Sequence, residues 1–379
     1  MTQTDPIDDT AAERAFRAQL DVVTPAAYVT TSLIAVNVLV FATACALGIS
    51  ILGGRAEEYL RLGANFAPLT TDGAWWRIAT CLFVHFGIVH LALNLWALWE
   101  CGRLGEKLLG NANFAAVYLF AGMCGGMASL LWSQQTITGG ASGAIFGVLG
   151  ALPACMLRAG ASVPATALNR LRISMSTFVA YSLFQGFAQT GIDNAAHLGG
   201  LAAGFTLGLI LARPLEPAQR RCGARRRLAL GLLLAAAVLP TCAWLIPDVS
   251  RVYRQALALQ KATAEFRAGE KVLQERFQHI VDESRRGKLR SADAGRTLRA
   301  TVVPEWNDLV GRLAHLDIDA QAPVRRDYEL LSRYAKARRD MVAAVADYLE
   351  SADVRDERRI AELRAQADEA LRLYAAQQK

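Results

Sequence analysis

The sequence predicts an all-α fold, in which a polytopic bundle of membrane-spanning helices is followed by a C-terminal extramembrane helical region. Apolar residues make up 53% of the 379 residues and charged residues 20%. That mixture is too apolar for an ordinary soluble protein and too charged for a chain wholly in lipid. The long apolar runs lie before about residue 247, and the remainder is dense in Arg, Glu and Asp. We expect a cytoplasmic N-terminal tail over 1–27, a membrane domain over 28–247 and an extracytoplasmic helical region over 248–379.

Seven apolar segments are candidates for membrane spans, since a helix needs about 20 mostly apolar residues to cross a bilayer. The second is the weakest candidate, because polar side chains such as His90 and Asn94 interrupt it. The fifth is short and moderately polar. The seven predicted spans are 28–52, 88–104, 114–132, 141–157, 173–187, 195–212 and 228–246.

Basic residues between the spans set the predicted orientation. Arg158, Arg170 and Arg172 separate the fourth and fifth spans, and a basic cluster over 213–227 separates the sixth and seventh. We therefore expect these loops and the N-terminus in the cytoplasm, in a multi-pass protein of a bacterial inner or cell membrane. The same loops account for the net charge of +7. The expected contacts are thus with membrane lipids, and no nucleic-acid partner is expected.

Polar residues of three even-numbered spans gather at one depth. His85, His90 and Asn94 stand at the outer end of the second span, Ser142 at that of the fourth and His197 at that of the sixth. An ionisable residue within a span costs about 2.5–3.5 kcal/mol on insertion scales, so it marks a functional site by default. We expect these side chains to meet near the outer membrane surface.

Ser142 and His197 are the candidate nucleophile and general base. A serine hydroxyl needs a base to take its proton, and imidazole titrates near neutrality. At a helix N-terminus, unpaired N–H groups and the helix dipole favour developing negative charge. His90 and Asn94 share a helical face and are donors that could complete an oxyanion site. Gly140 lets a substrate backbone approach closely.

Small residues recur at four-residue intervals on both spans that carry this pair. Such faces let two helices pack at close backbone distance. We therefore expect Ser142 and His197 to come within hydrogen-bonding reach. The two rows are Gly143, Gly147 and Ala151 on the fourth span, and Gly200, Gly204 and Gly208 on the sixth.

Each candidate also has a structural interpretation. Taken alone, Ser142 could be a small packing residue, and His197 or Asn94 could be a satisfied polar residue between helices. His85 and His90 could be metal ligands, but the sequence contains no HExxH motif and no CxxC pair. We expect neither a metal nor a cofactor. The joint pattern favours the serine nucleophile.

Three motifs resemble those of the rhomboid family of intramembrane serine proteases. They are HFGIVHLALN (85–94), GASGAIFG (140–147) and AHLGGLAAG (196–204), with supporting matches in WWR (75–77) and GRLGEKLLG (102–110). The resemblance covers about 60–212. It implies a rhomboid-like bundle of six core spans, with 228–246 as the extra seventh helix of some members.

The resemblance also implies roles for individual residues. Ser142 is similar to the family nucleophile and His197 to its general base, acting as a Ser–His dyad. His90 and Asn94 resemble the oxyanion-stabilising pair, and Gly140 resembles the glycine that shapes the loop before the nucleophile. Structural roles are implied for Arg77, His85 and Glu106. Phe146 stands where some relatives have a tyrosine that stacks on the histidine.

The implied reaction is hydrolysis of a peptide bond in or near a transmembrane helix of a membrane-protein substrate. The alternative is a catalytically silent relative that binds membrane helices and escorts them. Such relatives usually lack the serine or the histidine, and both are present here. A transporter is disfavoured, because the polar groups cluster at one depth and do not cross the membrane.

The C-terminal region, 248–379, has apolar residues at three- and four-residue spacing amid charges, which predicts a helical hairpin or small bundle. Breaks are expected at Pro304 and over 317–323. Two interpretations stay open. The region is either a spacer or self-associating bundle, or a module that binds a protein partner or regulates the membrane domain.

Overall fold

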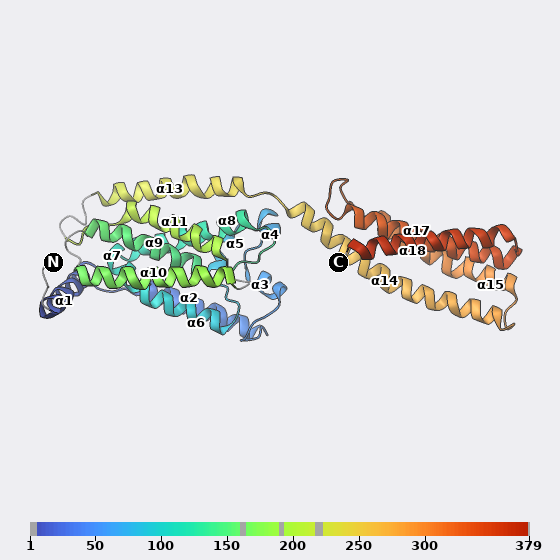
Figure 1. The fold of residues 1–379 in the computed structure, drawn as a ribbon, viewed down its shortest axis with the longest axis horizontal. Coiled ribbons are helices and arrows are strands. Elements are labelled where there is room, and N and C mark those ends of the chain that lie inside the picture. Colours follow the sequence, from blue (N-terminus) through green and yellow to red (C-terminus); the bar gives the residue numbers. More distant parts are fainter. Residues whose placement is uncertain (1–5, 160–163, 189–192, 217–222, 378–379) are drawn as a thin grey trace. The chain divides into compact units, whose positions relative to one another are not determined.

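The computed structural model describes residues 6–159, 164–188, 193–216 and 223–377, which are mainly helical (Figure 1). The chain divides into two compact units, Met1–Ser250 and Arg251–Lys379. The all-α class expected from the sequence is confirmed. The helices of the first unit are α1 (Pro6–Val23), α2 (Tyr28–Ala46), α3 (Ala56–Leu62), α4 (Ala67–Thr71), α5 (Arg77–Thr80), α6 (Ile88–Ala97), α7 (Arg103–Leu109), α8 (Asn111–Trp132), α9 (Ser142–Ala159), α10 (Ala165–Ala188), α11 (Asn194–Leu211) and α13 (Ala224–Leu245).

Every predicted span overlaps a helix of this unit. In the described part of the chain, α2, α8, α11 and α13 are long and apolar enough to cross a membrane. A bent pair, Arg77–Phe83 with Ile88–Leu109, reaches the same criteria as a possible fifth span with a break of 92°. The fourth predicted span, on α9, is apolar but shorter. Residues 98–102 join α6 to α7 as a π-helical turn, so the second predicted span is one helical rod.

Helix α2 ends at Ala46, earlier than the expected span 28–52. Gly48 has a φ of 95°, in the left-handed region that favours glycine, and the chain turns there. The segment after the turn supports the start of α6, since the Ile51 carbonyl accepts a hydrogen bond of 2.9 Å from the Ile88 N–H. The apolar residues beyond Ala46 therefore belong to a loop that positions the second span.

Helix α1 forms in the segment expected only as a tail. Phe16 and Leu20 are buried against the first unit. The Lys107 ammonium on α7 donates hydrogen bonds to the Asp21 carboxylate (2.6 Å) and the Thr24 carbonyl (2.7 Å). The four-residue spacing of Phe16 and Leu20 indicates an amphipathic helix, so the signal was present in the sequence.

Glu106 caps the start of α2 from a fully buried position on α7. Its carboxylate accepts hydrogen bonds from the Val29 N–H (2.7 Å), the Thr30 N–H (2.8 Å) and the Thr30 hydroxyl (2.6 Å). These donors include two of the N–H groups that a helix leaves unpaired at its first turn. Glu106 thus fixes α2 against the second span.

We expect Glu106→Ala to lower the stability of the membrane unit by about 2–3 kcal/mol, because it leaves three buried donors without their charged acceptor. Thermal unfolding in detergent measures this as a lower Tm. The matched control is Glu100→Ala, which removes an exposed carboxylate from the same helical rod. Equal Tm values for the two variants would contradict the role of Glu106 as a cap.

The second unit is a helical bundle with its own apolar core. On α14 (Ser250–Arg285), a buried seam recurs every seven residues, at Leu259, Phe266, Leu273 and Ile280. That repeat is typical of coiled-coil packing. The other helices of the bundle are α15 (Ser291–Thr297), α16 (Val303–Ala314), α17 (Arg325–Ser351) and α18 (Val354–Gln377).

Pro304 does not break the helix there, and that expectation was wrong. It lies in the first turn of α16, directly after a π-helical turn over 298–302, and the rod continues from Ser291 to Ala314. The π-helical turn just before it changes the backbone hydrogen-bond pattern locally, and such turns occur inside continuous helices, so the rod runs past the proline. The second expected break is confirmed, because α16 ends at Ala314 and α17 begins at Arg325.

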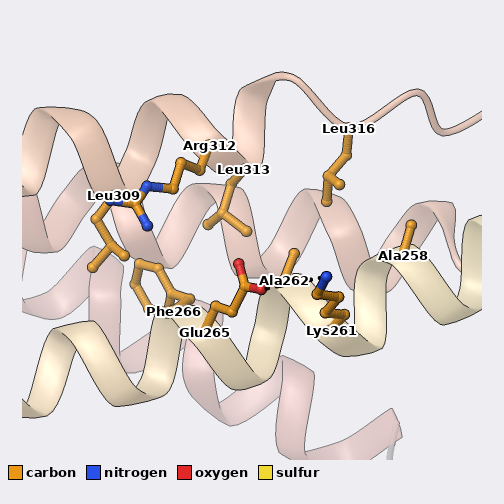
Figure 2. Close-up of a pocket in the computed structure, with 9 residues that line it drawn as sticks. All are labelled: Ala258, Lys261, Ala262, Glu265, Phe266, Leu309, Arg312, Leu313 and Leu316. Carbon is orange, nitrogen blue, oxygen red and sulfur yellow. Dashed lines mark ion pairs between the residues drawn. The ribbon is translucent and has the colours of Figure 1, made fainter.

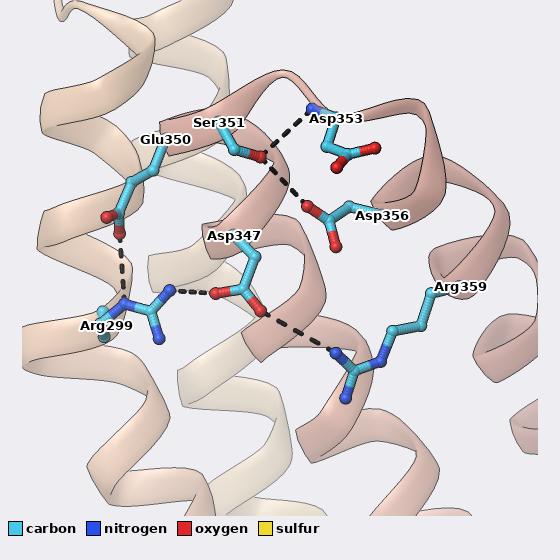
Figure 3. A network of polar contacts seen from close by, with 7 residues as sticks. All are labelled: Arg299, Asp347, Glu350, Ser351, Asp353, Asp356 and Arg359. Atoms are coloured by element: carbon cyan, nitrogen blue, oxygen red, sulfur yellow. Dashed lines mark hydrogen bonds and ion pairs between the residues drawn. The ribbon is translucent and has the colours of Figure 1, made fainter.

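Two surface features mark the second unit. A cleft between α14 and α16 has Phe266 and Leu313 among its apolar lining and a Lys261–Glu265 ion pair of 3.9 Å at its rim (Figure 2). On its other helices, the Arg299 guanidinium contacts the carboxylates of Asp347 and Glu350 on α17 (Figure 3). Exposed ion pairs contribute little to stability each, so the apolar seam is what holds this bundle together.

Candidate active site

Ser142 is the first residue of α9, and the loop before it is held in place by the backbone. The Gly140 N–H donates to the Cys81 carbonyl at 2.9 Å. Gly140 has a φ of 119°, which disfavours any other residue, and a Cβ there would lie 2.8 Å from the His90 ring. The loop therefore needs glycine at this position both for its conformation and for its space.

His197 lies in the first turn of α11 and faces Ser142. Its Nε2 is 2.9 Å from the Ser142 hydroxyl oxygen. The Phe146 ring, one turn after Ser142 on α9, stacks on the imidazole with ring centres 4.2 Å apart and planes within 3° of parallel. His197 is 6% exposed. The geometry thus brings the predicted nucleophile and base into hydrogen-bonding contact and fixes the plane of the base.

The close approach of α9 and α11 comes from the predicted rows of small residues. A Cβ added at Gly200 would lie 2.0 Å from the Gly143 carbonyl oxygen, and one at Gly204 would lie 1.9 Å from that of Gly147. Real Cβ atoms cannot approach an oxygen so closely. The two backbones are therefore in direct contact, which only glycine permits.

His90 and Asn94 project from α6 toward Gly140, beside the Ser142 loop. His90 Nδ1 accepts a hydrogen bond of 3.3 Å from the Phe86 N–H. Because a ring nitrogen that accepts cannot carry the proton, the neutral His90 ring has its N–H at Nε2, on the edge of the ring that lies against Gly140. The Asn94 amide nitrogen donates to the His90 carbonyl at 2.9 Å. Both side chains thus present donors on the side of α6 that faces the loop.

His85 and Arg77 tie loops together near this site. His85 Nε2 accepts from the Ala141 N–H at 3.4 Å, while its Nδ1 is 3.3 Å from the Phe83 carbonyl. The Arg77 guanidinium donates to the carbonyls of Leu60 (2.6 Å) and Ala64 (2.9 Å). These contacts give both residues supporting positions away from the Ser142 hydroxyl.

The sequence interpretation missed a hydrogen-bonded chain at the start of α11. The Asp193 carboxylate accepts from the Ala196 N–H at 2.9 Å and from the Thr138 hydroxyl at 2.9 Å. The Thr138 hydroxyl is also 2.6 Å from that of Ser129 on α8. An aspartate just before an apolar helix is a sequence signal for an N-cap, and it lies four residues before His197.

The described residues do not support a metal site at His85 and His90. In the parts of the chain that the structure describes, no three His, Cys, Asp or Glu residues are placed to hold a metal ion. His85 and His90 lie with ring centres 5.2 Å apart and have the separate hydrogen-bond partners given above.

Comparison with known proteins shows which domain this part of the chain is similar to. Residues 72–214 match the sequence profile of the family described as Rhomboid domain. The chain is 38% identical over 194 residues to Rhomboid protease GluP of Bacillus subtilis (strain 168), a match that covers 50% of this chain and 36% of that protein. Against RHOMBOID-like protein 5 of Arabidopsis thaliana the identity is 33%, over 42% of this chain and 52% of the relative.

A further bacterial relative is Rhomboid protease AarA of Providencia stuartii, at 28% identity over 42% of this chain and 64% of that protein. The chain thus spans roughly one to two thirds of the length of these relatives. The family profile ends at residue 214, before the second compact unit begins. The likeness to the family therefore concerns the membrane unit that contains Ser142 and His197.

Proposed function

We propose that this multi-pass membrane protein, whose residues 72–214 match the Rhomboid domain, is an intramembrane serine protease of the rhomboid family. Its substrates are membrane proteins, cut at peptide bonds in or near their transmembrane helices. The observation that carries the proposal is the 2.9 Å contact between the Ser142 hydroxyl and His197 Nε2. Two of its relatives carry the name rhomboid protease, which supports the same reaction.

The proposed reaction begins with proton transfer from the Ser142 hydroxyl to His197 Nε2. The serine oxygen attacks the carbonyl carbon of the substrate and forms a tetrahedral intermediate. Collapse of the intermediate breaks the C–N bond, and His197 returns the proton to the leaving amine. A water molecule then repeats the sequence on the acyl-enzyme, with His197 again acting first as base and then as acid.

The negative charge of the intermediate would develop beside α6. The His90 Nε2–H, the Asn94 amide and the Ser142 backbone N–H are the proposed donors to that oxygen. The position of Ser142 at the first turn of α9 supports this assignment, since the positive end of the helix dipole also favours an oxyanion there.

No carboxylate is hydrogen-bonded to the imidazole among the described groups. His197 Nδ1 is buried and has no hydrogen-bond partner among the described groups. The parallel Phe146 ring and the backbone of α11 instead fix the plane of the ring. This supports a dyad, in which aromatic stacking does the orienting that a third polar residue does in a triad.

We expect Phe146→Leu to lower kcat about 3- to 10-fold, because an aromatic pair contributes about 0.5–1.5 kcal/mol beyond its burial. Phe146→Tyr keeps the ring and should retain activity near that of the wild type. Steady-state cleavage of a transmembrane substrate measures both variants. Full activity in the leucine variant would show that the stack does not orient the base.

Aromatic side chains line the proposed route from lipid to the dyad. Phe178 on α10 has its ring centre 6.4 Å from that of Trp96 on α6 and 6.0 Å from that of Phe146. Separation of α6 from α10 would open the space beside His197 to a substrate helix. That helix must unwind locally, because its own hydrogen bonds shield the carbonyls, and Gly or Ser residues make unwinding easier.

Exposed tryptophans support a site near one membrane surface. Trp132 and Trp244 end α8 and α13 and are both 83% exposed. Tryptophan is enriched at the boundary between lipid and water. The loop after Trp132 leads directly to Ser142, so the dyad lies close to that boundary.

In the proposed orientation this boundary is the outer membrane surface, and the N-terminus is cytoplasmic. We expect a reporter fused at Ala376 to report an extracytoplasmic location. A cytoplasmic signal from that reporter would contradict the orientation.

The direct test uses purified protein in liposomes with a single-span substrate that has Gly and Ser in its helix. We expect two products, whose masses place the cut in or beside the span. The matched substrate has leucine at the Gly and Ser positions and should be cut far more slowly. Binding of the substrate without any product would reject the protease and favour the silent helix-binding relative.

A further inference from the structure

We infer that Asp193 is a positioning residue for the proposed dyad, acting through a hydrogen-bonded clamp of Ser129, Thr138 and Asp193. The inference rests on the proposed function of Ser142 and His197. The clamp joins three elements: α8 by Ser129, the loop before α9 by Thr138, and the start of α11 by Asp193. These are the elements whose relative placement sets the distance between nucleophile and base.

The hydrogen bonds of the clamp have a defined direction. The single Thr138 hydroxyl proton goes to Asp193 Oδ2 at 2.9 Å. Thr138 must then accept from the Ser129 hydroxyl, which is 2.6 Å away. Asp193 Oδ1 accepts from the Ala196 N–H at 2.9 Å. The carboxylate therefore receives bonds from two elements at once, the loop and its own helix.

Asp193 fixes His197 through the first turn of α11. Asp193 is the N-cap, and the His197 N–H makes the first turn's backbone bond to the Asp193 carbonyl at 3.1 Å. Loss of an N-cap frays the turn that it closes. Here that turn carries the general base, whose side chain must stay 2.9 Å from the Ser142 hydroxyl.

Thr138 fixes the other half of the dyad. Its backbone pairs with Asn65 in both directions, each hydrogen bond being 2.8 Å. The Asn65 amide donates in turn to the Gly126 carbonyl of α8 at 3.0 Å. Thr138 lies four residues before Ser142, so its side chain is the direct connection from this anchored loop to the helix of the base.

The Asp193 carboxylate makes no hydrogen bond to the imidazole among the described contacts, so its proposed positioning effect on His197 runs through the first turn of α11. The buried His197 Nδ1 has no hydrogen-bond partner among them either. Asparagine can replace both functions, because its Oδ1 can cap Ala196 and its Nδ2 can donate to Thr138. The asparagine variant therefore keeps the hydrogen bonds of the clamp and removes the charge, so the two effects can be measured separately.

The test compares Asp193→Ala, Asp193→Asn, Thr138→Val and Thr138→Ser in the full-length protein. The readouts are kcat, KM and the rate of Ser142 labelling by a fluorophosphonate, which reports nucleophilicity without substrate docking. We expect Asp193→Ala and Thr138→Val to lower kcat and the labelling rate about 10- to 100-fold, the scale of an ångström-sized misplacement, with KM little changed. Asp193→Asn and Thr138→Ser should keep kcat and the labelling rate within about 3-fold of wild type.

Thr206→Val is the matched control, since it removes a hydroxyl from α11 that bonds only the Ala202 carbonyl of the same helix. It should leave kcat unchanged. The double variant Asp193→Ala/Thr138→Val should be no slower than Asp193→Ala alone, because both remove one connection. Wild-type rates in Asp193→Ala, or equal losses in Asp193→Asn and Asp193→Ala, would overturn the inference.

Hydrogen exchange separates this inference from the proposed function. Amide exchange over 194–197 and 138–141 should rise in Asp193→Ala and not in Asp193→Asn, whether or not the protein cleaves a substrate. No rise would overturn the clamp. A wild-type protein that neither labels nor cleaves would reject the protease instead, and the exchange rates alone would then decide whether the clamp exists.

Discussion

Ser142→Ala and His197→Ala are each expected to abolish cleavage of a transmembrane substrate, with kcat lower by a factor on the order of 10⁴ or more. The first removes the oxygen that attacks the carbonyl, and the second removes the only base within hydrogen-bonding distance of it among the described contacts. Because the two side chains act as a unit, the double variant should be no slower than either single variant.

Cleavage rates in liposomes, with matched protein amounts, measure this loss. Each variant keeps the shape of its helix, so the thermal unfolding curve should stay close to that of the wild type. Equal cleavage by the wild type and both variants would place the activity elsewhere in the preparation. If Ser142→Ala lost cleavage while His197→Ala kept full activity, a group other than His197 would activate the Ser142 nucleophile.

Gly204→Val is expected to cause the largest structural effect. The added Cβ would lie 1.9 Å from the Gly147 carbonyl oxygen, so α9 and α11 must separate. Overpacking of a tight core costs about 3 kcal/mol or more when backbone has to move. The same separation draws Ser142 away from His197, and we expect kcat to fall about 100-fold at temperatures where the protein is still folded.

Gly126→Ala is the matched control for that substitution. A Cβ at Gly126 on α8 would have its nearest neighbour at 3.5 Å, an ordinary van der Waals distance. The alanine variant should keep the Tm and kcat of the wild type. Similar losses for both glycines would mean that the membrane unit tolerates no added side chain, and the specific α9–α11 contact would not be the cause.

The helices and the contact between Ser142 and His197 could be predicted because their signals are local or repeated. A long apolar segment indicates a membrane span whatever it packs against. The rows of small residues at four-residue spacing that contain Gly143 and Gly200 predicted the close contact between two helices. Ser142 and His197 stood out because polar groups are costly in lipid. These signals can be recognised in the sequence without knowledge of the tertiary structure.

The rest depended on contacts between distant segments. Helix α2 stops at Ala46 because the following residues pair with the start of α6, and only the fold shows that pairing. Pro304 follows a π-helical turn inside a continuous rod, and nothing in the local sequence marks that turn. Asp193 carried an N-cap signal, but its link to Thr138 spans 55 residues and has no sequence pattern.

Covalent labelling of Ser142 tests the central claim most directly. A fluorophosphonate reacts with an activated serine oxygen and loses fluoride, so peptide mass spectrometry of the labelled protein identifies the nucleophile. We predict one adduct on Ser142 in the wild type and none in His197→Ala. An adduct of equal yield in His197→Ala, or a modified serine elsewhere in the chain, would contradict the Ser142–His197 dyad.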